Sequence, residues 1–184
     1  MAIRCTSPID PAFIPRLKAG EPVLLSGVVY TARDAAHAWM ITAIENSDPL
    51  PFDLWGQTIF YTGPTPTPPG RVCGAIGPTT SARMDAFTPA LLRRGLKAII
   101  GKGDCGENVR RAIVENGAVY FAAPAGCAAY LSACVESIEV VAYEDLGTES
   151  IKRLTVKDLP LVVAIDCMGN DIYEIGPKDY LSRI

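Results

Sequence analysis

The sequence predicts an α/β fold with a largely parallel central sheet. The first observation is that strand-like and helix-like segments alternate through the middle of the chain, as they do where helices connect parallel strands. The second is that hydrophobic residues make up 49% of the 184 residues and charged residues 20%, so the chain can form a core. The length suits one domain, which we assign to residues 1–184.

The first part of the chain is predicted to supply a strand, a helix and a long loop. Residues 21–30 (EPVLLSGVVY) fit a strand, and residues 34–46 fit a helix whose apolar residues recur at helical spacing. Thr31, followed three residues later by an aspartate, resembles a capping box at the start of that helix. Six prolines then make residues 47–70 a rigid, non-helical connection, which a short strand at 58–61 interrupts.

The rest of the chain alternates between short strands and short helices. The expected strands lie at residues 71–76, 96–101, 118–122, 137–143 and 161–166. The expected helices lie at residues 80–87, 88–94, 104–116 and 127–135. In the third of these helices, Asp104 is the predicted N-cap and Gly117 the predicted stop.

Composition and charge exclude several classes of protein. A net charge of −3 gives no overall basic field for nucleic acid. No apolar run approaches the roughly 20 residues that span a bilayer, so no membrane partner is expected. Residues 1–16 contain no apolar signal-peptide core, which indicates a cytoplasmic protein. The six scattered cysteines form no CxxC, so we expect mostly buried thiols and no metal site made by this chain alone.

Three basic residues lie in turns that join a predicted strand to the next helix. Arg33, Arg83 and Lys102 each stand at or inside the predicted first turn of that helix. The helix dipole disfavours a cation there, and such local conflicts tend to mark functional sites. Because turns after parallel strands gather at the carboxyl edge of a sheet, these cations predict an anion site. Two arginine forks and a lysine suit a small dicarboxylate better than a single phosphate.

Other roles for these charged residues remain open. The three cations could instead extend into solvent or pair with the nearby carboxylates Asp34, Asp85 and Asp104. His37, the only histidine, lies one turn after Arg33. It could face the same pocket or be an ordinary helix histidine, half buried or at the surface.

Residues 77–85 (GPTTSARMD) resemble the GPTT-x-x-RMD signature of class I fumarases and L-tartrate dehydratases. Residues 31–37 (TARDAAH) resemble the T-x-R-D-x-A-H segment of the same family. Shorter matches follow at residues 100–103, 118–126, 144–147 and 159–171. The resemblance extends from about residue 5 to residue 178, nearly the whole chain, and the order of its segments is specific.

The resemblance implies a fold and a division of labour between two chains. The fold is a swivelling β/β/α domain that closes over a cofactor. The cofactor is a [4Fe–4S] cluster, held on three cysteines by a separate α subunit rather than by this chain. The resemblance therefore implies a heteromer, for which we expect the stoichiometry α2β2. The proline-rich residues 47–70 are a candidate contact with the α subunit.

The resemblance also assigns roles to residues of this chain. Thr79 corresponds to the proposed base, which moves a proton on the carbon next to a carboxylate. Arg83 and Lys102 would stabilise its alkoxide. Together with Arg33 and Thr80, these two cations would bind the substrate carboxylates. His37, Asp34 and Asp85 are candidates for supporting positions around the site.

Three functions are compatible with these residues. The first is the β subunit of a fumarate hydratase, which converts fumarate reversibly to (S)-malate, and the RMD form of the signature favours it. The second is the β subunit of an L(+)-tartrate dehydratase, which forms oxaloacetate, and another dicarboxylate such as mesaconate is also open. The third is a stand-alone dicarboxylate-binding domain. A pure binding domain has no need of Thr79 beside Arg83 and Lys102, so the intact set favours the enzyme.

Overall fold

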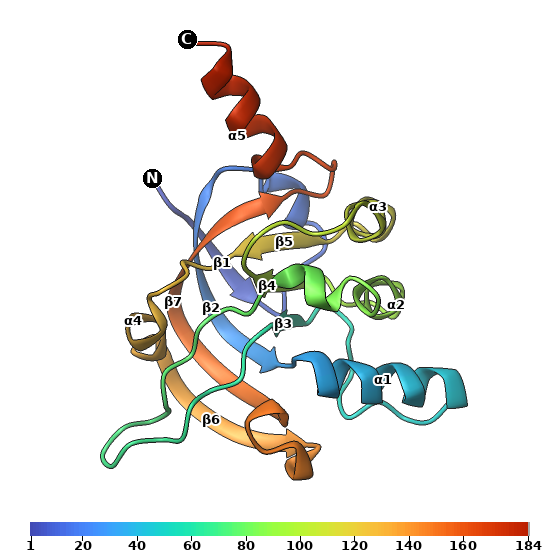
Figure 1. Ribbon diagram of the computed structural model, residues 1–184, viewed down its shortest axis with the longest axis vertical. Coiled ribbons are helices and arrows are strands. Elements are labelled where there is room, and N and C mark those ends of the chain that lie inside the picture. The colour runs from blue at the N-terminus through green and yellow to red at the C-terminus, as the bar shows by residue number, and fades with distance from the viewer. Residues whose placement is uncertain (184) are drawn as a thin grey trace.

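One mixed β-sheet of seven strands organises the structure, a computed structural model that describes residues 1–183 (Figure 1). Ile184, the last residue of the predicted domain, lies outside the described residues. The strands are β1 (Ile3–Ser7), β2 (Pro22–Thr31), β3 (Thr58–Phe60), β4 (Ala98–Gly101), β5 (Val119–Ala122), β6 (Val135–Ala142) and β7 (Ile151–Ile165). The α-helices are α1 (Asp34–Asn46), α2 (Thr88–Arg93), α3 (Glu107–Asn116), α4 (Ala128–Ser132) and α5 (Ile172–Leu181). Short 3-10 helices are η1 (Ile14–Arg16), η2 (Ser81–Met84) and η3 (Glu144–Glu149).

The sheet is partly parallel and closes into a small barrel. Strands β1 to β5 pair in chain order, and each of these pairs is parallel. The long strand β7 runs antiparallel to β2, β5 and β6. Because β7 pairs with both β2 and β5, strands β2, β3, β4, β5 and β7 form a closed ring. The predicted α/β class is confirmed, but a largely parallel sheet describes only the strands before β6.

The core has two parts, one on each side of the barrel wall. Neighbouring residues of a strand point to opposite faces of the sheet. Thus Phe60 and Ile100 belong to one buried cluster, which β1, β2, β7 and α4 also supply. Ile59 and Ile99 belong to the other, together with apolar residues of α1, α2 and α3. These three helices lie on the same side of the barrel in Figure 1, so they cover its outer wall while the first cluster fills its interior.

The strand predicted at residues 71–76 is absent from the described chain. This segment turns back on the proline-rich loop, where Thr65 donates its N–H to the carbonyl of Ala75 at 3.1 Å. The N–H of Ala75 donates in return to Oγ1 of Thr65 at 2.9 Å. The prolines around Thr65 have no N–H to offer a sheet, so the pairing does not extend into a ladder. The predicted irregular connection with a short strand near 58–61 is confirmed.

The predicted limits of α1 are correct, but the two inferred N-terminal caps, those of α1 and α3, are both wrong. Helix α1 has the predicted bounds, but its N-cap residue is Arg33, whose side chain makes no capping hydrogen bond. The predicted capping box is wrong because Thr31 Oγ1 instead accepts the N–H of Lys152 on β7, at 3.0 Å. Helix α3 begins three residues later than predicted, with Gly106 rather than Asp104 as its N-cap.

The elements that were not predicted either depend on long-range strand pairing or lie near the ends of the sequence. Strand β7 begins ten residues before the predicted strand, because its first part pairs with β2 and β6. Strand β1 and helix α5 were also not predicted. Helix α5 extends away from the barrel, and none of its residues is buried (Figure 1). Within residues 1–183, the structure contains no helix that is both long and apolar enough to cross a membrane.

Candidate active site

The parallel strands bring the three basic turns to one edge of the barrel. In register, Thr31 at the end of β2 lies beside β3, and β3 lies beside β4, so these strands end at the same edge. Arg33 follows β2 and Lys102 follows β4. The segment that contains Thr79 lies between them. The N–H of Thr79 donates to the carbonyl of Tyr61 at 2.7 Å, and the N–H of Lys102 donates to the carbonyl of Thr79 at 3.2 Å.

One carboxylate connects the two arginines of this edge. Nε of Arg83 donates to Oδ1 of Asp34 at 2.8 Å. Nη2 of Arg33 lies 3.5 Å from Oδ2 of the same aspartate. Nη1 of Arg83 lies 3.5 Å from the hydroxyl oxygen of Thr79. The alternative pairing of the arginines with Asp34 is therefore confirmed, and of the two guanidinium groups that of Arg83 lies beside Thr79.

Lys102 is fixed through its backbone. It forms an isolated parallel bridge with Thr80, and its carbonyl accepts the N–H of Ser81 at 2.9 Å. Its side chain is half-buried and forms no ion pair with any residue in the described part of the chain. Thr80 is exposed and precedes η2 without a side-chain capping bond. Thr79, in contrast, is half-buried and lies next to a cation.

The helix-dipole argument applies to only one of the three cations. Arg33 is the N-cap residue of α1, where the partial positive charge of the helix is concentrated. Arg83 lies in the last turn of the short helix η2. Lys102 precedes α3, which begins only at Glu107. The gathering of the three residues follows from strand order, not from three helix N-termini.

His37 supports the backbone of Arg33 from the core. The imidazole has 0% exposure and packs edge-on against Tyr61, with ring centroids 5.2 Å apart. Nδ1 lies 2.9 Å from the carbonyl oxygen of Arg33. A carbonyl only accepts, so Nδ1 carries the proton. Burial lowers the pKa of His37 to about 4, so the ring is neutral at physiological pH.

Asp85 and Asp104 organise the turn before α3 and bind no cation within residues 1–183. Oδ2 of Asp85 accepts the N–H of Gly106 at 2.8 Å, and its carbonyl accepts from Asn108. Burial raises the pKa of Asp85. Oδ1 of Asp104 accepts the N–H of Cys105 at 2.7 Å. Both carboxylates therefore fix the loop that carries Lys102.

One residue of the site was missed by the sequence analysis. Glu149, in η3, places Oε1 3.5 Å from Nη2 of Arg33. Its Oε2 accepts the N–H of Ala35 at 3.1 Å. Residues 144–147, which resemble a segment of the family, end two positions before Glu149, so the sequence signal pointed to this turn but not to Glu149 itself. Its contact with Arg33 depends on tertiary structure alone.

The described residues do not fit a [4Fe–4S] cluster. Cys5 and Cys73 are buried in the barrel interior, whereas Cys105 packs against the other cluster. Burial raises the pKa of Cys5 to about 11 and also raises the pKa of Cys73 and Cys134, which disfavours the thiolate that binds metal. Within residues 1–183, no three His, Cys, Asp or Glu side chains are placed to hold a metal ion.

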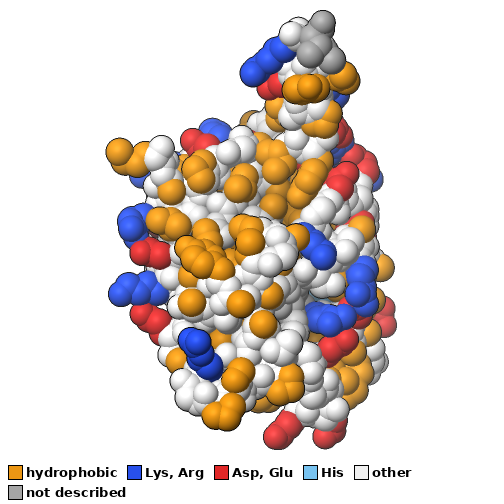
Figure 2. Space-filling model, turned by 60° about the vertical axis from the view of Figure 1, so that its left-hand side comes forward, with side chains coloured by type: hydrophobic (Ala, Val, Ile, Leu, Met, Phe, Trp, Pro, Cys, Tyr) orange, Lys and Arg blue, Asp and Glu red, His pale blue; other side chains and the backbone are white. Residues whose placement is uncertain are grey.

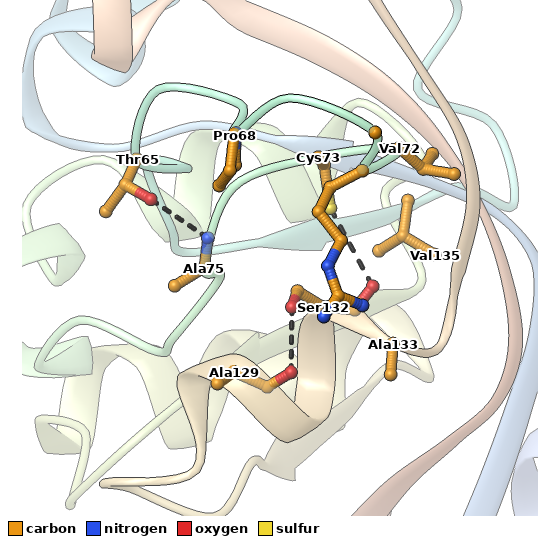
Figure 3. Close-up of a pocket in the computed structure, with 11 residues that line it drawn as sticks. Thr65, Pro68, Val72, Cys73, Ala75, Ala129, Ser132, Ala133 and Val135 are labelled. Atoms are coloured by element: carbon orange, nitrogen blue, oxygen red, sulfur yellow. Dashed lines mark hydrogen bonds between the residues drawn. The ribbon is translucent and has the colours of Figure 1, made fainter.

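A cavity of about 510 Å³ lies between the proline-rich loop and α4, and none of the three cations lines it. Figure 3 shows Thr65 hydrogen-bonded to Ala75 on one wall, and Cys73 reaching toward Ser132 on another. Apart from Arg71, its lining is small or apolar. The cavity lacks the convergent charged groups present at the barrel edge.

Comparison with known proteins connects this geometry to one family. The family described as fumarase C-terminus matches residues 3–176. A Methanocaldococcus jannaschii protein, provisionally named L(+)-tartrate dehydratase subunit beta, is 40% identical over 174 residues, which are 91% of this chain and 89% of the relative. The Escherichia coli K12 L(+)-tartrate dehydratase subunit beta is 34% identical over 97% of this chain and 90% of its own length.

Another relative is much longer than this chain. The aerobic class I fumarate hydratase of Escherichia coli K12 is 35% identical over 152 residues. These residues are 82% of this chain but only 28% of that enzyme. The region described here thus occurs both as a separate β subunit and as part of a longer enzyme. The chain belongs to the fumarase C-terminus family.

Proposed function

We propose that this chain is the β subunit of a hydro-lyase, which adds water reversibly to fumarate together with an α subunit. The observation that carries the proposal is the Asp34 bridge, which contacts the guanidinium groups of both Arg33 and Arg83 while Arg83 lies 3.5 Å from the hydroxyl of Thr79. Two planar guanidinium groups at one edge of the barrel match the two carboxylates of a small diacid. The resemblance of GPTTSARMD to the fumarase signature supports the same assignment.

Thr79 is proposed to move the proton on the carbon next to a substrate carboxylate. A threonine hydroxyl is a very weak acid, so its alkoxide requires cationic stabilisation. Arg83, 3.5 Å from this hydroxyl, and Lys102, whose backbone binds that of Thr79, are the available cations. Arg33, together with Thr80, which bridges to Lys102, would hold the carboxylate and the negative charge that grows on it.

The charge balance of the edge supports a site that a partner completes. Arg33 and Arg83 face the carboxylates Asp34 and Glu149, so most of their charge is offset within the chain. Lys102 adds a further positive charge at this edge, and no carboxylate among the described residues forms an ion pair with it. A dicarboxylate brings two negative charges, and the remaining stabilisation must come from outside this chain.

We further propose that the α subunit holds the [4Fe–4S] cluster and that the complex is α2β2. The subunit beta names of two relatives support the partner, and the burial of Cys5 and Cys73, which raises the pKa of both thiols, supports placing the cluster elsewhere. This domain would swivel to close its carboxyl edge over that cluster. The six free cysteines support a reducing compartment, the cytoplasm.

The proposed contact with the α subunit is the face that carries α4 and the proline-rich loop. These elements lie together at the left of Figure 1, the side that comes forward in Figure 2. Apolar and uncharged side chains dominate this view, and charged ones lie mainly at its rim. A broad apolar surface of this kind is typical of a protein interface.

L(+)-tartrate is the second candidate substrate. The specific observation in its favour is length, because two tartrate dehydratase β subunits match this chain over about nine tenths of their own sequences. Fumarate and tartrate chemistry would use the same Thr79 and the same cations. Malate, the hydrated form of fumarate, and tartrate differ by one hydroxyl group, which neighbouring polar side chains can discriminate.

The test is turnover by the reconstituted pair. The chain is co-expressed with its α subunit without oxygen and supplied with iron and sulfide, and fumarate and L-tartrate are offered in parallel. We expect fumarate hydration by the pair and none by either chain alone. Preference for L-tartrate would keep the mechanism and change the substrate.

Thr79→Ala should still co-purify with the α subunit while losing about 10²- to 10⁴-fold in kcat. A normal rate in this variant would remove Thr79 from the base role.

A further inference from the structure

Glu149 makes two contacts at the start of α1 with one carboxylate. Oε2 accepts the N–H of Ala35 at 3.1 Å, and Oε1 lies 3.5 Å from Nη2 of Arg33. The side chain is 28% exposed, so solvent screens this pair only partly. Arg33 itself is 24% exposed, and its Nε is buried without an acceptor among the described residues. The orientation of the guanidinium group therefore depends on the carboxylates that face Nη2.

Helix α1 lacks a cap from its own N-cap residue. The side chain of Arg33 cannot accept the free N–H groups of the first turn, and a cation there opposes the helix dipole. Glu149 supplies the missing acceptor for one of these N–H groups, and its negative charge adds to that of Asp34 in the first turn. A residue 114 positions away from Ala35 thus performs the role of the N-cap side chain.

The turn that carries Glu149 is held rigidly by a lysine of β7. Nζ of Lys152 lies within hydrogen-bonding distance of four oxygens: the carbonyls of Gly147 (2.9 Å), Thr148 (3.2 Å) and Ser150 (3.4 Å), and the hydroxyl of Ser150 (2.6 Å). Its ammonium group is partly buried, and burial lowers its pKa. Because this ammonium group binds several oxygens of residues 147–150, it fixes the shape of the turn that carries Glu149.

The other side of Arg33 is closed by a glycine. A Cβ added at Gly63 would lie 3.2 Å from Cδ of Arg33 and 2.9 Å from Cγ2 of Thr148. Arg33 therefore runs through a narrow gap between residue 63 and the turn before β7. Its aliphatic part is confined by packing, and its charged end is confined by Asp34 and Glu149.

We propose that Glu149 is a positioning residue, which orients the Arg33 guanidinium toward a substrate carboxylate, and that Lys152 holds the turn that presents Glu149. The proposal rests on the proposed function only in taking Arg33 as a carboxylate-binding residue. Without the Glu149 charge, Arg33 keeps its own charge but loses one of its two anchors. Substrate binding must then also order the Arg33 guanidinium group. This cost raises KM more than it lowers kcat.

The kinetic test uses Glu149→Gln in the reconstituted α–β complex. The amide keeps an oxygen for the N–H of Ala35 but removes the charge that faces Arg33. We expect KM for the dicarboxylate to rise about 10-fold while kcat changes by less than about 3-fold. The matched control is Glu144→Gln, the same chemical change at an exposed position of the same turn, where KM should not change. Equal KM values for wild type and Glu149→Gln would overturn the proposal.

A second readout does not depend on turnover. In the full β chain, NMR of arginine Nε–H groups should give a slowly exchanging signal for Arg33, because this Nε is buried. Arg33→Lys assigns the signal. We expect Glu149→Gln to speed its exchange with water about 10-fold and Glu144→Gln to leave it unchanged. Inactivity of the wild-type complex with this NMR effect present would reject the proposed function alone. Absence of the NMR effect would reject the positioning role whatever the activity.

Discussion

Arg33 and Lys102 lie at the same edge of the barrel but are held in opposite ways. Arg33 is held along its whole length: its carbonyl accepts from His37, and its guanidinium faces Asp34 and Glu149. Lys102 is held only by its backbone, while its side chain makes no ion pair among the residues described. A glycine stands on each side of it in the sequence.

Under the proposed function, this difference assigns substrate binding to Arg33 and charge stabilisation during the reaction to Lys102. A planar fork that is oriented before substrate arrives loses little entropy on binding, so Arg33 is suited to recognise a carboxylate. A free ammonium on a flexible stem can follow charge as it develops, so Lys102 is suited to stabilise the alkoxide or the substrate anion. Substitutions at the two positions should therefore change different kinetic constants.

Among the substitutions that test the contrast between Arg33 and Lys102, the largest effect is expected for Lys102→Met, which removes the less restrained cation. We expect kcat to fall about 10²- to 10³-fold, because a transition-state charge loses its partner. The melting temperature should stay within about 2 °C of wild type, since Lys102 forms no ion pair within residues 1–183 whose loss would destabilise the fold. Steady-state kinetics of the complex and thermal unfolding of the chain measure the two quantities.

The control for that substitution is Lys18→Met, which makes the same change at an exposed lysine before β2, at the opposite end of that strand. It should leave kcat unchanged. If Lys102→Met instead destabilised the chain and spared kcat, the contrast between a held and a free cation would be wrong.

An intermediate effect is expected for His37, whose imidazole donates to the backbone carbonyl of Arg33. Its folded-state pKa, about 4, lies below the ordinary value of 6.5, so the unfolded chain takes up the proton first as pH falls. Stability should therefore decrease between pH 6.5 and pH 4, by about 2 kcal/mol at pH 5. In His37→Gln, which does not titrate, this loss should be absent, because His37 is the only histidine in the sequence.

Urea unfolding of both proteins at pH 7, 6 and 5 measures this effect. The difference between wild type and variant isolates His37 from the carboxylates, which titrate in both proteins. Parallel pH profiles for the two proteins would mean that His37 is not buried in its neutral form.

The smallest effect is expected for Arg33→Lys, which keeps the charge and removes the fork. We expect KM to rise about 10-fold, equivalent to about 1.4 kcal/mol, with kcat nearly unchanged. Arg93→Lys, an exposed position at the end of α2, is the matched control. A fall in kcat without a change in KM would assign Arg33 to the chemical step and remove the contrast with Lys102.

Local sequence pattern predicted the elements that local forces stabilise. Residues 34–46 were predicted as a helix with its observed bounds, and the strand at 21–30 is displaced by only one residue. The first part of β7 contains Lys157, Asp158 and Pro160, which disfavour a strand in isolation. Pairing with β2 and β6 overrides that preference, and no local window contains this information.

The candidate site shows the same division. Arg33, Thr79, Arg83 and Lys102 were found from turns and motifs, and strand order brings their segments together. Their proposed roles remain to be tested. Glu149 could not be found in this way, because its significance depends on a contact with a residue more than a hundred positions earlier. Sequence reasoning identifies groups that carry chemistry more readily than groups that hold them.

Strand β7 also sets when the site can form during synthesis. The cations of the barrel edge belong to the first 102 residues, but the ring of strands closes only through residues 151–165. Until that stretch leaves the ribosome, β2 and β5 each expose an unpaired edge, and Arg33 has no Glu149 beside it. We therefore expect the nascent chain to depend on its last strand for a competent site, so that assembly with the α subunit follows translation of this chain rather than accompanying it.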